Sequence, residues 1–193
     1  GEDHMTIKDA HFQHGDAKMS VKGVVQWASD EERAAHPATN PTLRPSLTIA
    51  ATDVPIDDTL LAALPPMHAK WLQKLNAQGR FDLAGKLTNS PTSGLDFAFD
   101  VSLHDCKLWS QGDRYAINGL TGNLKLTPTT LTLIDLKGKR GDSDVAAQGQ
   151  VSWPGNVPQM QIVAEAKNLA LDEPLFNMLP EPAQRSWVAG RPE

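Results

Sequence analysis

Apolar and polar residues alternate along much of this chain. The clearest stretch runs from 95 to 104, where Leu95, Phe97, Phe99, Val101 and Leu103 are separated by polar or small residues. Side chains of a β-strand point alternately to its two faces, so this pattern predicts a strand with one apolar face. Further strand-like segments lie at 5–13, 17–27, 46–54, 79–87, 115–127, 131–139, 143–153 and 159–169, and the turns at 14–16 and 140–142 predict hairpins. We therefore predict a mainly β, α+β fold, with an antiparallel, twisted, groove-like sheet covered on one face.

The pattern changes to a helical one between 56 and 78. Asp57 is a good N-cap for a short helix that must end at Pro65-Pro66. A second helical segment follows, with apolar residues at helical spacing (Met67, Trp71, Leu72, Leu75). Gly79 fits the position just after its C-terminus.

The chain also contains an internal repeat. Met5–Trp27 and Leu131–Trp153 align without a gap, with seven identities in 23 positions, and Val54–Pro65 aligns with Leu169–Pro180. We predict a first repeat over 1–130, with strands in 5–54, a helical segment at 56–78 and strands in 79–127. A partial second repeat covers 131–193, with strands in 131–169 and a helical segment at 172–189 that is capped by Asp172. The charged, proline-rich stretch 28–44 reads as a loop. The chain is expected to be a piece of a longer protein.

Composition narrows the choice of function. The 193 residues are 40% hydrophobic and 21% charged, with a net charge of −5 and no Lys/Arg cluster, so nucleic acid is not an expected partner. No apolar run approaches the ~20 residues of a membrane span. The single cysteine, Cys106, excludes an intrachain disulfide and a multi-cysteine metal site.

Two sets of polar residues invite a catalytic or metal-binding interpretation. His11 and His14 have the spacing of metal ligands, but the second repeat has Lys137 and Arg140 in their places. Asp57-Asp58 resembles an acid–base pair, yet helix capping explains it better, because acidic residues precede the helix in both repeats.

A third candidate is His104-Asp105-Cys106, which could suggest a nucleophile. Simple alternation would place His104 and Cys106 on one face and Asp105 on the other. No activating group accompanies them, so a structural role is favoured. The glycines at 119, 122 and 138 do not form a nucleotide-binding turn. Trp27 and Trp153 occupy equivalent positions and are expected to cover the apolar edge of the sheet.

A family resemblance emerges from the succession of short strands that each close on Gly and an aliphatic residue. It runs through Ile117–Thr127, Leu131–Leu136, Gly141-Asp142 and Ala147–Val151. This succession resembles the AsmA-like family of bacterial envelope proteins, which includes TamB-type proteins, and Val54–Pro65 resembles the helical insertions of its large members. The resemblance implies long β-sheets folded into a groove with an apolar inner face, which carries phospholipid between membranes. It also implies a periplasmic location and a parent protein anchored in the inner membrane through regions outside this chain.

Pattern and resemblance together favour a non-enzymatic segment that conducts or binds phospholipid acyl chains, with no cofactor and no metal. An envelope protein is a further possible partner. The expected lipid-facing residues are Phe81, Leu83, Phe97, Phe99, Val101, Leu103, Leu124 and Leu126. The alternative is a scaffold β-repeat module that binds a protein partner, and an unrecognised hydrolase is the least favoured interpretation. The two leading hypotheses differ in whether the sheet is an open groove or a closed sandwich.

Overall fold

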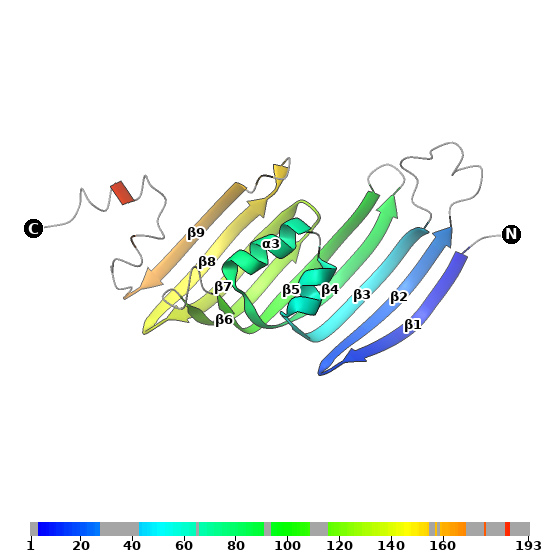
Figure 1. Ribbon diagram of the computed structural model, residues 1–193, viewed down its shortest axis with the longest axis horizontal. Helices are drawn as coiled ribbons and strands as arrows, with labels where there is room; N and C mark the ends of the chain where they lie inside the picture. The colour runs from blue at the N-terminus through cyan, green and yellow to red at the C-terminus, as the bar shows by residue number, and fades with distance from the viewer. Residues whose placement is uncertain are drawn as a thin grey trace, which may run out of the picture.

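The chain folds into one antiparallel sheet in which the strands follow each other in sequence order (Figure 1). The computed structural model describes residues 4–27, 43–64, 66–90, 94–108, 116–154, 157, 159–168, 176, 184 and 185. Its nine strands are β1 (His4–His14), β2 (Ala17–Trp27), β3 (Leu43–Pro55), β4 (Gln78–Ser90), β5 (Gly94–Leu108), β6 (Ile117–Leu126), β7 (Thr130–Arg140), β8 (Ser143–Ser152) and β9 (Gln159–Lys167). The predicted fold, mainly β with short helices and an antiparallel, groove-like sheet, is confirmed, and the structure adds that this sheet is open.

Two short helices, α2 (Asp58–Ala63) and α3 (Pro66–Leu75), connect β3 to β4. Asp57 caps α2 as predicted, because its carboxylate accepts a hydrogen bond from the Leu60 backbone N–H at 2.9 Å. The predicted role of Gly79 at the end of the second helix is wrong. Asn76 follows α3 with a φ of 45° and takes the left-handed position there, whereas Gly79 lies inside β4.

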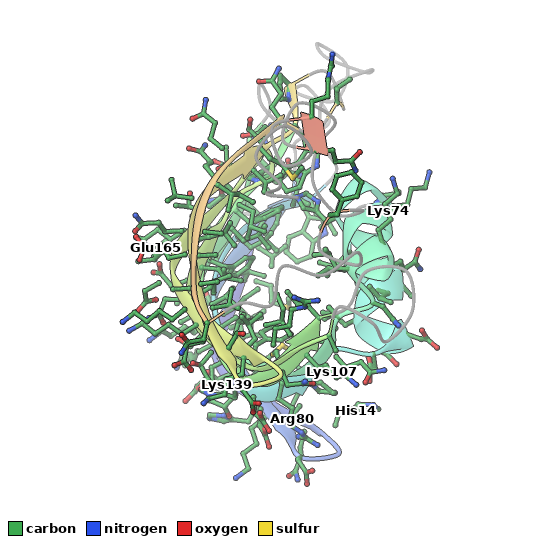
Figure 2. All side chains as sticks on the ribbon, turned by 90° about the vertical axis from the view of Figure 1, so that its left-hand side faces the viewer. His14, Lys74, Arg80, Lys107, Lys139 and Glu165 are labelled. Atoms are coloured by element: carbon green, nitrogen blue, oxygen red, sulfur yellow. The ribbon has the colours of Figure 1, made fainter. Side chains whose placement is uncertain are left out.

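The sheet is strongly curved, and both helices lie on its concave side (Figure 2). Extra residues in individual strands contribute to this curvature, because a β-bulge bends its strand and increases the local twist. Register shifts between Ala51 and Val54, and between Leu103 and Cys106, include Asp53 and Asp105, whose φ angles are 59° and 48°. The face toward the helices is called the inner face below, and the opposite one the outer face.

The buried core lies on the inner face beneath the helices. One cluster is centred on β5, β6 and β7 and comprises Cys106, Leu120, Leu133 and Leu136. A second comprises Leu131, Val151 and Trp153, of which Val151 is 0% exposed. Leu124 packs against both clusters, so they form a continuous apolar layer.

The two predicted repeats have matching hairpins. In β1–β2 the register shifts between Ile7 and Ala10, and in β7–β8 it shifts between Leu133 and Leu136, the positions 126 residues later. The turn glycines Gly15 and Gly141 have φ angles of 59° and 58°. These hairpins therefore share bulge and turn geometry at aligned positions.

Other parts of the predicted repeat organisation are described only in part. The strands and helices up to 127 fall within the predicted segments 5–54, 56–78 and 79–127, apart from shifts of one or two residues. Strands also occupy most of 131–169. The predicted helical segment 172–189, with its Asp172 cap, lies outside the described residues except for 176, 184 and 185, and most of the predicted loop 28–44 also lies outside them. The division into repeats at 130 remains an interpretation.

Candidate functional site

Two rows of apolar side chains cross the whole inner face at right angles to the strands. The Met19 row, read from pairing partner to pairing partner, is Phe12, Met19, Ala51, Leu83, Val101, Leu124, Leu133, Gly149 and Ile162. The Val21 row is Ala10, Val21, Ile49, Gly85, Phe99, Leu126, Leu131, Val151 and Met160. Strands lie about 4.8 Å apart, so each row is about 38 Å long. No member of either row is polar, and only Gly85 and Gly149 contribute no side chain.

The outer face is mostly polar at the positions between these two rows. The Ser20 row, between the two apolar rows in sequence, is His11, Ser20, Ala50, Ala84, Asp100, Lys125, Thr132, Gln150 and Gln161. Neighbouring strands are also linked there by polar contacts: Lys125 pairs with Asp100 at 3.4 Å, and Lys139 pairs with Asp144 at 3.3 Å. Figure 2 shows Glu165 on this convex side, facing away from the helices. The sheet is therefore solvated on its outer face and apolar on its inner face.

Helix α3 covers the middle of the inner face. Its His68 is 6% exposed, and the imidazole packs edge-on against Trp153 at a ring distance of 4.8 Å and near Phe97 at 6.5 Å. Neither ring nitrogen of His68 has a hydrogen-bond partner. Burial lowers the pKa of His68, because the charged form loses hydration there. A titratable side chain thus lies at the contact between this helix and the sheet.

The two lateral ends of the inner face are more open than its middle. Large apolar side chains that face inward on the first three strands are Met5 (46% exposed), Phe12 (54%), Met19 (39%), Trp27 (41%) and Leu43 (46%). On β9 the corresponding residues are Met160 (63%) and Ile162 (44%). Trp27 and Trp153 align in the repeat, but only Trp153 is buried, at 5% exposure, because it lies against His68 of α3. The difference in exposure between these two tryptophans therefore comes from the covering helix and not from the strand pattern.

The structure brings the eight predicted lipid-facing residues together on the inner face. Pairing places Phe81 beside Leu103, Leu83 beside Val101, and Phe99 beside Leu126. Val101 also pairs with Leu124, and the rings of Phe97 and Phe99 stack at 5.6 Å. Phe81 is buried, while the other seven are half-buried. Their role in binding lipid remains a prediction.

Sequence reasoning missed the outlying members of the rows. Phe12, Met19, Met160 and Ile162 extend the apolar surface to both lateral ends, and His68 joins α3 to it. The bulge at 7–10 hides the first of these, because it shifts the alternation of β1 by one residue between Ile7 and Ala10. The sequence of the second repeat indicates such a bulge, because the apolar residues there pass from odd to even positions between Leu133 and Leu136, where the register shifts.

The same effect corrects the interpretation of His104-Asp105-Cys106. These residues were expected to place His104 and Cys106 on one face, but Asp105 has a left-handed backbone and the register shifts there. Cys106 therefore points into the inner core, where burial raises the pKa of its thiol and the thiol donates to the Arg80 carbonyl at 3.2 Å. His104 lies on the outer face and contacts the Asp82 carboxylate at 3.0 Å. A nucleophile and base on opposite faces of a sheet cannot act together.

The remaining polar candidates have structural surroundings. His11 contacts the Asp9 carboxylate at 3.1 Å on the exposed surface. Within the described residues, no group of three or more His, Cys, Asp and Glu side chains could hold a metal ion. Among these same residues, no helix has the length and apolarity that crossing a membrane would require.

Comparison with known proteins adds no relative, because the chain matches no family model, no curated protein and no solved structure. The functional argument therefore depends on the residues and their geometry.

Proposed function

We propose that this chain binds phospholipid acyl chains on its inner face and conducts them across the strands along the Met19 and Val21 rows. The continuity of those two rows over nine strands carries the proposal. A bilayer leaflet has a hydrocarbon depth of about 15 Å, so a row of about 38 Å is about two and a half times as long as that depth. Such a surface lets a chain slide without leaving an apolar environment.

The chemistry of the face suits transfer rather than catalysis. Acyl chains need dispersion contacts and exclusion of water, and the two rows offer these at every strand. Movement along them breaks no covalent bond, so the proposed function is non-enzymatic and needs no cofactor. The proposal places the chain in the AsmA-like family, in the bacterial envelope, within a parent protein attached to the inner membrane by regions outside this chain.

At both lateral ends of the inner face, exposed apolar side chains are available to a lipid. Met19 and Phe12 at one end, and Met160 and Ile162 at the other, are substantially exposed. The contact of His68 with Trp153 closes part of the apolar surface in the middle of the inner face. A lipid acyl chain can pass this point only if α3 shifts or if the acyl chain runs beside the helix. Of these two routes the proposal adopts the first, in which α3 is a movable cover.

The test combines lipid extraction with a pair of matched variants. Purified protein is extracted with organic solvent, and the extract is examined by mass spectrometry for phospholipid. In parallel, binding of a fluorescent-acyl phospholipid is measured for the wild type, Met19→Glu and Ser20→Glu. The two positions are neighbours in β2, but Met19 belongs to an apolar row and Ser20 to the outer row.

We expect Met19→Glu to weaken lipid binding at least about tenfold, because bound hydrocarbon would strip water from the new carboxylate. Met19 is 39% exposed, so in the lipid-free protein that carboxylate stays hydrated and the fold is retained. Ser20→Glu should bind like the wild type. Equal binding by all three folded proteins, or an extract without phospholipid, would leave the scaffold module as the better interpretation.

A further inference from the structure

The first strand repeats the geometry of β7 but lies at the edge of the sheet. β1 and β7 share a threonine (Thr6 and Thr132), an aspartate (Asp9 and Asp135) and the register shift around that aspartate. Their partner strands also match, since Gly23 and Gly149 both have a φ of 145°. A Cβ atom on either glycine would lie 2.1 Å from a backbone carbonyl oxygen of the next strand. The β1–β2 and β7–β8 hairpins therefore have the same bulge and the same close approach of a glycine to the next strand.

The pairing of β7 with β6 shows which residues a strand of this geometry accepts as its neighbours. The Asp135 carboxylate accepts hydrogen bonds from the backbone N–H of Asn123 at 2.9 Å and from its side-chain amide at 3.2 Å. The preceding residue, Gly122, has a φ of 133°, and a Cβ there would lie 2.5 Å from the Asp135 carbonyl oxygen. The bulged strand thus selects a Gly-Asn pair on the strand that joins it. Aliphatic residues follow, with Leu124 beside Leu133 and Leu126 beside Leu131.

In β1 the equivalent edge has no neighbouring strand among the described residues. The Asp9 carboxylate is 61% exposed and contacts the imidazole of its neighbour His11 at 3.1 Å. Met5 and Phe12, which face inward along β1, are 46% and 54% exposed. Backbone groups along an open edge strand are a template for another strand. A partner with alternating aliphatic residues would also cover Met5.

We propose that the open edge of β1 binds an extended polypeptide strand with the pattern of β6, in which a Gly-Asn pair is followed by alternating aliphatic residues. The Asn docks on the Asp9 carboxylate, and the glycine lies against the backbone of the bulge. In the β6–β7 pair, Leu124 and Leu126 lie beside Leu133 and Leu131. The residues of β1 that correspond to Leu133 and Leu131, 126 positions earlier, are Ile7 and Met5, so the partner's aliphatic residues would lie beside these two. A strand docked here would extend the sheet next to one lateral end of the inner face, but its recognition through Asp9 and the bulge does not depend on the proposed lipid function.

The bulge makes this recognition specific. A regular strand cannot pair along the whole of a bulged edge, because the extra residue breaks the hydrogen-bond ladder. The glycine opposite the bulge allows the backbones to approach, and the asparagine supplies the donors that Asp9 accepts. A side chain at the glycine position would block that approach, as the 2.5 Å distance in the β6–β7 pair shows.

The experiment uses a peptide with the sequence of Ile117–Leu126 and a matched peptide that carries Gly122→Val. Each is added to the full chain at up to about 1 mM, which detects weak complexes, and affinity is measured by fluorescence anisotropy of a labelled peptide. Amide hydrogen exchange then locates the bound strand. We expect slower exchange at the amides of β1, and no binding of the Gly122→Val peptide.

Two protein variants separate recognition by Asp9 from a general charge effect. Asp9→Ala should weaken the peptide about tenfold, because two hydrogen bonds to a carboxylate are lost. Asp96→Ala removes an exposed carboxylate from β5, in the middle of the sheet, and should change nothing. The proposal is overturned if β1 exchange does not slow at about 1 mM peptide. It is also overturned if the Gly122→Val peptide binds equally well, if slowing occurs at β9 instead, or if β1 is protected by self-association of the protein alone.

Discussion

Acidification should loosen α3 from the sheet through His68, and replacing this residue should remove the effect. The imidazole is buried against Trp153 and Phe97, and neither of its nitrogens has a hydrogen-bond partner. Burial lowers the pKa of His68 below its ordinary value of 6.5. The unfolded chain therefore binds more protons than the folded one as the pH falls. The stability contributed by neutral His68 is complete above pH 6.5 and declines as the pH falls from 6.5 toward the lowered pKa.

The size of this effect has an upper limit. If the folded protein kept His68 wholly neutral at pH 5, protonation of this residue in the unfolded state would lower the free energy of unfolding by about 2 kcal/mol relative to pH 8. His68→Leu abolishes that term, because leucine does not titrate. At pH 8 the variant also removes two unsatisfied polar atoms, worth about 1–3 kcal/mol, and loses an aromatic contact worth about 0.5–1.5 kcal/mol. We therefore expect the variant to be about 1 kcal/mol more stable at pH 8, and the gap to widen at pH 5.

Urea denaturation of both proteins at pH 8 and pH 5 measures the double difference in the free energy of unfolding. Other titrating groups cancel in this difference, because they are common to both proteins. Hydrogen exchange along α3 reports whether the loss is local to the helix. An equal pH dependence in the wild type and His68→Leu would show that His68 does not couple protonation to the fold.

Three further predictions test separate parts of the structure. Asp57→Ala should lower the free energy of unfolding by about 1 kcal/mol through loss of the N-cap of α2, and a weakened phospholipid affinity in this variant would contradict a purely structural role. Gly149→Ala should destabilise the protein by at least about 1–3 kcal/mol, because its φ is 145° and a Cβ would lie 2.1 Å from the Gln161 carbonyl oxygen. Gly141→Ala, at a turn where a Cβ meets nothing within 4 Å, should cost less in the same thermal melts, and the reverse order would refute the bulge argument. Cys106 should react with a thiol reagent only as fast as the protein opens, since it is 1% exposed and burial raises its pKa; rapid labelling of the native protein would show that the inner core is open there.

The sequence alone determined most of the described strands and helices and the two-sided character of the sheet. Alternation in 95–104 predicts a strand because side-chain direction along an extended backbone is a local property, and the structure confirms this up to Leu103. The N-cap at Asp57 was equally predictable, since capping involves residues three positions apart. The predicted lipid-facing residues share a face for the same reason, although Phe12, Met19, Met160 and Ile162 were not recognised as extending it.

Tertiary structure decided where alternation breaks and which residues meet. The left-handed backbone at Asp105 sends His104 and Cys106 to opposite faces, and the bulge after Ile7 shifts the side chains of β1, because one extra residue reverses the parity of everything beyond it. The apolar rows depend on registers between strands that are far apart in the sequence. The burial of Trp153, in contrast to the exposed Trp27, depends on where α3 docks. A linear pattern specifies the face of side chains within a regular stretch of strand, but only the assembled sheet and its covering helix determine where that stretch ends and which parts of the face stay open.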